Sequence, residues 1–114
     1  MKTSALVQKA WRVDPTAMPL DELIDMATVN GARALNINSG KIEAGKLADI
    51  LLIDKEQYSF VPGLNFYADL VYSANSSCID TVICDGEVVM EGRKVAKEQE
   101  IIENVKRLYN KLIR

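Results

Sequence analysis

The sequence predicts an α+β fold, with helices at both ends of the chain and a small antiparallel sheet between them. Apolar residues recur at helical spacing in the first 35 residues and again after Lys97. The run Ala48–Asp54 holds four successive large apolar residues between aspartates, which is too short for a helix and typical of a strand covered on both faces. Two further apolar runs flank Asp85-Gly86, the dipeptide that a two-residue type I′ hairpin favours.

The N-terminal region predicts two or three helices. The first carries a short helical stripe and ends before Pro15. The second begins at Pro19, a residue suited to a first helical turn. Thr28 could cap a further short helix, Val29–Leu35, so one bent helix and two short helices both remain open. The stripe residues are Ala5, Leu6, Lys9, Ala10 and Val13 in the first helix and Leu20, Leu23, Ile24 and Ala27 in the second.

The middle of the chain alternates loops with short elements. Asn36–Gly40 is a loop by composition, and the turn at Gly45-Lys46 leads into the strand at 48–54. Residues 55–65 look irregular, with a turn at Pro62-Gly63. Phe66–Ala74 predicts a short helix because its apolar residues are four apart.

The hairpin around Asp85-Gly86 has a predicted register. Counting back from the turn pairs Cys84 with Glu87, Ile83 with Val88, Val82 with Val89 and Thr81 with Met90. Side chains alternate along a strand, so one face collects Ile79, Ile83, Val88 and Met90. We expect that face to point to the core.

An amphipathic helix is predicted for residues 97–114. Its acidic residues come first and its basic residues last, which complements the helix dipole. Its apolar stripe consists of Ile101, Val105, Leu108 and Leu112, widened by Ile102, Tyr109 and Ile113. Three strands make a thin sheet with open edges, and natural proteins usually cover or pair such edges. We therefore expect the chain to oligomerise or to complete its sheet with strands from elsewhere.

Size and charge narrow the class of protein. A chain of 114 residues and 12.7 kDa has room for one domain or part of one. Fourteen basic residues against sixteen acidic ones give a net charge of −2, which gives no reason to expect a nucleic acid or an acidic membrane as partner. No apolar run reaches the ~20 residues of a membrane helix, and no signal peptide is evident. We expect a cytoplasmic protein.

The chain contains no histidine, which excludes every site type that needs one. It cannot build a zinc site from histidines, nor a Ser-His or Cys-His nucleophile. The two cysteines, Cys78 and Cys84, are too few for a disulfide scaffold and are expected to be reduced and partly buried. Neither has a positive neighbour that would mark a reactive thiol.

The carboxylates also favour structural interpretations. Asp49 and Asp54 bracket one strand and lie roughly 16 Å apart along it, too far for joint acid–base work. We interpret both as solvated strand-end residues and Asp85 as a turn residue. Asp69 and Tyr72 could share a helix face, as a surface pair or a partner contact rather than a catalytic pair.

Two remaining candidates have simple structural explanations. The glycines at 40 and 45 with Lys46 lack the spacing of a phosphate loop, and the strand follows them instead of preceding them. Trp11 beside Arg12 is expected to anchor the first helix. We therefore assign no catalytic, cofactor-binding or metal residue.

Several segments, taken in order, carry recognisable motifs. Met26–Leu35 reads MAT-x-NGA-x-AL, and Gly40–Ile50 reads G-x-IE-x-GK-x-AD followed by an apolar residue. Leu70–Ala74 reads LVY-x-A, and Val82–Gly92 contains the DG hairpin. In this order the motifs resemble the C-terminal end of the metal-dependent amidohydrolases, in the branch of cytosine, guanine and S-adenosylhomocysteine/methylthioadenosine deaminases and triazine chlorohydrolases. Met1–Lys9 is similar to the helix after that family's last barrel strand.

The resemblance covers roughly residues 1 to 95 and implies an architecture. Members are (β/α)8 barrels with a small β-sandwich domain built from both chain ends. It implies that residues 1–35 are the last barrel helices, residues 36–96 part of the composite sandwich, and residues 97–114 a terminal amphipathic helix. Asn36 stands where the family often has glycine, which affects only a loop.

The resemblance also implies a reaction for the parent enzyme. A water activated by one or two divalent metals, zinc or iron, attacks a heterocycle of nucleoside type, and ammonia or halide leaves. None of the family's metal ligands can be placed in this chain. The implied role is thus structural, and the implied partners are a second copy or the N-terminal part of the parent. A dihydroorotase-like or deacetylase-like parent is a lesser variant.

A second interpretation stays open, in which the chain is a stand-alone, non-catalytic module that self-associates or binds a partner subunit. Both interpretations predict no turnover by this chain alone. They differ in whether a barrel with an HxH motif accompanies it.

Overall fold

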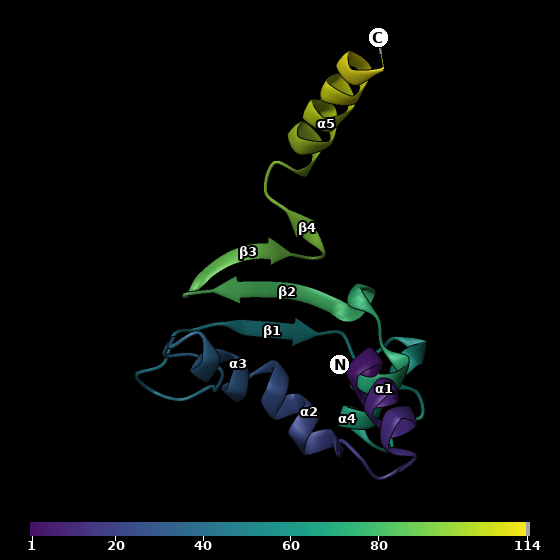
Figure 1. Ribbon diagram of the computed structural model, residues 1–114. Helices are drawn as coiled ribbons and strands as arrows, with labels where there is room; N and C mark the ends of the chain where they lie inside the picture. The colour runs from purple at the N-terminus through teal and green to yellow at the C-terminus, as the bar shows by residue number, and fades with distance from the viewer. Residues whose placement is uncertain (114) are drawn as a thin grey trace.

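The computed structural model describes residues 1–113 and shows helices at both ends of a small sheet (Figure 1). The N-terminal helices are α1 (Lys2–Arg12), α2 (Leu20–Ala27) and α3 (Val29–Ala34). The sheet consists of β1 (Ile50–Ile53), β2 (Ile79–Cys84), β3 (Glu87–Glu91) and β4 (Lys94–Val95), in that order and antiparallel throughout. Between β1 and β2 lie a 3₁₀ turn (Tyr58–Phe60), α4 (Phe66–Ala68) continued by a π-helical turn (Asp69–Ser73), and a second 3₁₀ turn (Ser76–Cys78). The chain closes with α5 (Glu98–Leu112).

The helices begin and end close to the predicted positions. Val13, in a left-handed conformation, ends α1 two residues before Pro15. The open question at Thr28 is resolved as two helices, α2 and α3, which meet at that residue. Thr28 does not cap α3 through its side chain. Its hydroxyl donates instead to the carbonyl oxygen of Ile24, 2.7 Å away in the preceding turn.

Part of the predicted hairpin register is wrong. Cys84 pairs with Glu87 and Ile83 with Val88 as expected, but Val82 pairs with Met90 because a bulge interrupts the ladder. Beyond the bulge the chain turns at Gly92-Arg93, and β3 pairs with the short β4, an element that no pattern in the sequence predicts. Met90 therefore shares a face with Val82, and Val88, expected in the core, is 58% exposed.

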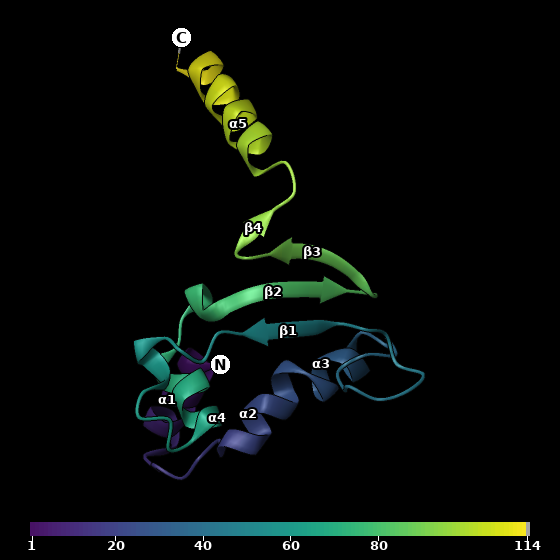
Figure 2. The same cartoon turned by 180° about the vertical axis from the view of Figure 1, so that it is seen from behind.

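The strand β1 is not covered on both faces as predicted. Leu51 and Leu52 are each about half exposed (53% and 49%). The helices α2 and α3 lie on the β1 side of the sheet (Figures 1 and 2), yet a cavity rather than packed side chains separates α3 from β1. The apolar side chains of β1 are thus not covered on both faces, although the sequence predicts a strand buried between two layers.

The core of the described residues is small. Ala5, Leu23 and Val71 bring together α1, α2 and the π-helical turn, with four partly buried neighbours around them: Met18, Leu20, Ile24 and Tyr72. Phe60 is buried separately and stacks on Phe66 at a ring-centroid distance of 5.7 Å. No helix within residues 1–113 has the length and apolar character needed to cross a bilayer.

The overall shape is extended. The radius of gyration is 17.9 Å, against about 13 Å for a compact domain of this length. The accessible surface is 8974 Å², against about 6200 Å² for a compact monomer of this mass. The excess, roughly 2700 Å², is the size of surface that obligate interfaces bury.

Candidate functional site

A mainly apolar cavity of about 600 Å³ lies between α3 and the β1–β2 pair. Helix residues, the loop after α3 and the ends of two strands contribute to its wall. Its main apolar lining residues are Ala32, Leu35, Ile37, Ile42, Leu51 and Val82. The polar side chains in its wall are Thr28, Ser39, Lys41 and Asp49, and Ser39 donates to Asp49. The rest of the wall is apolar, so its chemistry suits burial of apolar side chains better than binding of a charged small molecule.

Asp49, at the start of β1, holds the loop after α3 against the hairpin turn. The hydroxyl of Ser39 donates to one carboxylate oxygen of Asp49, and the backbone N–H of Asp85 donates to the other at 2.9 Å. The N–H of Gly86 also donates to the carbonyl oxygen of Ala48, 3.1 Å away. The hydrogen bond from Ser39, and then that from Asp85, lowers the pKa of Asp49.

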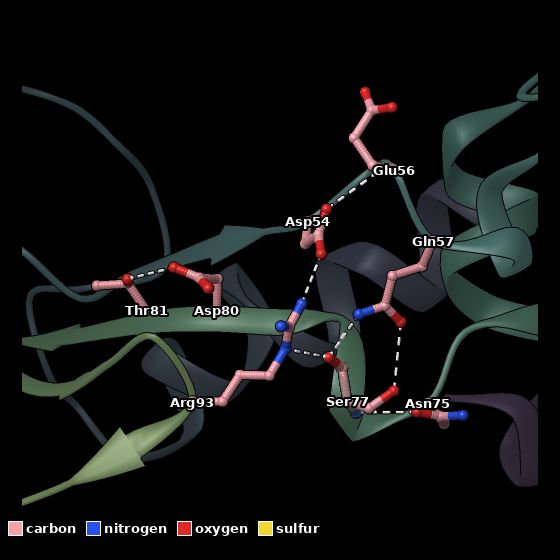
Figure 3. A network of polar contacts seen from close by, with 8 residues as sticks. All are labelled: Asp54, Glu56, Gln57, Asn75, Ser77, Asp80, Thr81 and Arg93. Carbon is pink, nitrogen blue, oxygen red and sulfur yellow. Dashed lines mark hydrogen bonds and ion pairs between the residues drawn. The ribbon is translucent and has the colours of Figure 1, made fainter.

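Asp54, at the other end of β1, belongs to a polar network that joins three separate segments, residues 54–57, residues 75–77 and Arg93 (Figure 3). Its carboxylate accepts from the backbone N–H of Glu56 at 3.0 Å and forms an ion pair with Arg93. The N–H of Glu56, and then the guanidinium of Arg93, lowers the pKa of Asp54. Arg93 also donates through Nε to the carbonyl oxygen of Ser77 at 2.8 Å, and Gln57 donates to the same oxygen at 2.8 Å.

The aspartates are therefore not merely solvated strand ends. Each fixes a turn, and the structure places them at opposite ends of β1 rather than in one site. The network residue that sequence reasoning missed is Arg93. Its signal is the Gly92-Arg93 pair, both residues with positive φ (+55° and +63°), as a two-residue turn between β3 and β4 requires.

Other predicted residues also differ from expectation. Trp11 is 84% exposed and does not anchor α1. Asp69 is not part of a simple surface pair, because its Oδ2 is buried and has no hydrogen-bond partner within residues 1–113. Cys78 is buried and Cys84 exposed, both as thiols. Lys46 donates to the side chain of Asn38 at 2.8 Å, a loop-internal contact.

The residues described do not form a metal site, although the family resemblance implies a divalent metal in the parent enzyme. The chain has no histidine, and its described part contains no group of three Cys, Asp or Glu side chains placed to hold a cation. The carboxylates of Asp49 and Asp54 are engaged by loop donors. The donor set thus does not fit the metal.

Known proteins are similar to this chain in sequence and in fold. A family model described as "Amidohydrolase family" matches residues 1–89. The chain is 42% identical to a 5'-deoxyadenosine deaminase of Methanococcoides burtonii, covering 99% of this chain and 26% of the relative. It is also 42% identical to a 5-methylthioadenosine/S-adenosylhomocysteine deaminase of Desulforudis audaxviator, covering 99% and 27%.

A solved structure agrees with these relatives. The crystal structure of an adenosine deaminase from Xanthomonas campestris with bound zinc superposes with a TM-score of 0.89 at 26% identity, covering 96% of this chain and 26% of that one. The chain spans about a quarter of the length of the relatives it matches. By family match, sequence identity and fold, the chain belongs to the amidohydrolase family and corresponds to a C-terminal portion of such an enzyme.

Proposed function

We propose that this chain is the C-terminal structural part of a metal-dependent amidohydrolase that deaminates a nucleoside-type substrate, and that it has no activity by itself. The observation that carries the proposal is the unburied surface. A chain 42% identical to a deaminase over 99% of its length exposes roughly 2700 Å² more than a compact monomer would. That surface includes the walls of the apolar cavity and the outer edge of β1.

The contacts of the two aspartates favour a structural role for this chain over a catalytic one. The polar networks of Asp49 and Asp54 use their carboxylates to hold turns, so these groups are not directed into a common cavity. The apolar cavity behind β1 has the lining of an unfilled core. Side chains from a larger barrel domain would fill it and would cover Leu51.

A chimera tests the proposal directly. The segment of the Methanococcoides burtonii 5'-deoxyadenosine deaminase that aligns with this chain is replaced by residues 1–114, and ammonia release from 5'-deoxyadenosine is measured. We expect activity within about tenfold of the parent, a difference of less than about 1.4 kcal/mol in transition-state stabilisation. The parent enzyme lacking the segment, and the chain alone with added zinc, should release no ammonia.

Two results would overturn the proposal. One is a chimera that melts at the temperature of the parent and yet releases no ammonia. The other is turnover by the isolated chain. The intact mass of the product of its own gene gives a further check, because a mass several times 12.7 kDa supports the proposal. A product of 12.7 kDa would favour the stand-alone module.

A further inference from the structure

We draw no further inference here: the strongest candidate, the exposed apolar face of helix α5 (Glu98–Leu112), carries no proposal, because nothing in the structure of residues 1–113 shows what covers it.

Discussion

The close approach of Gly40 to the junction of α2 and α3 leads to a quantitative prediction. A Cβ added at Gly40 would lie 2.8 Å from the carbonyl oxygen of Thr28 and 2.9 Å from the Cα of Val29. Both are backbone atoms, so no flexible side chain can move aside. Gly45 is the matched control, because it has nearly the same φ (+86° against +87°) and no atom of residues 1–113 within 4 Å of its added Cβ.

The comparison of the two glycines gives an expected difference in melting temperature between their alanine variants. Alanine at either position adopts a left-handed conformation at a cost of about 1–2 kcal/mol. The smaller entropy of the unfolded chain offsets about 0.4–1 kcal/mol of this cost. Gly40→Ala alone adds overpacking against backbone, which costs about 1–3 kcal/mol. One kcal/mol corresponds to roughly 4 °C at this chain length, so Gly40→Ala should melt about 4–12 °C below Gly45→Ala.

Thermal unfolding followed by circular dichroism at 222 nm measures this difference for the wild type and both variants. The wavelength reports helix content, which includes the α2–α3 junction. Equal melting temperatures for the two variants would refute the argument, because they would show that the junction yields to the added methyl group at no cost.

Two further predictions concern the turns and the thiols. Hydrogen bonds lower the pKa of both Asp49 and Asp54 in the folded state, so their contribution to stability is present above the unfolded value of about 4 and is lost as the pH falls through the folded value. Asp54→Asn should therefore lower the melting temperature at pH 7 and by less at pH 3; an equal effect at both values would contradict the assignment. With an aromatic disulfide reagent, Cys84 should react at once and buried Cys78 only as the chain unfolds. Two fast thiols in the native protein would contradict the described burial.

Turn dipeptides and residues typical of helix ends predicted those elements whose conformation depends on neighbouring residues in the chain. The Asp85-Gly86 turn fixed the first two pairs of the hairpin, and proline and threonine positions located the ends of α1 and α2. The bulge beyond Ile83 could not be predicted in this way. It depends on a second turn at Gly92-Arg93 and on β4, an element of two residues with no periodicity of its own.

The candidate site residues also differ in how far the sequence alone could predict them. The absence of histidine decided from composition alone which sites this chain cannot form. The role of Arg93 was not visible, because it depends on contacts with Asp54 and Ser77, 39 and 16 residues away along the chain. The exposure of Leu51 was likewise invisible, since an apolar strand has the same sequence whether or not its second layer is present.

The outer edge of β1 has a consequence for how this chain behaves in concentrated solution. Ile50–Ile53 is apolar throughout, ends the sheet, and leaves one row of backbone groups without a neighbouring strand among residues 1–113. Edges of this kind recruit strands from other molecules, and flanking charges are a common means of preventing it. Asp49 and Asp54 flank the run, so the same carboxylates that fix the turns also act as its gatekeepers. Acid would neutralise both, and the chain would then be expected to aggregate through this edge.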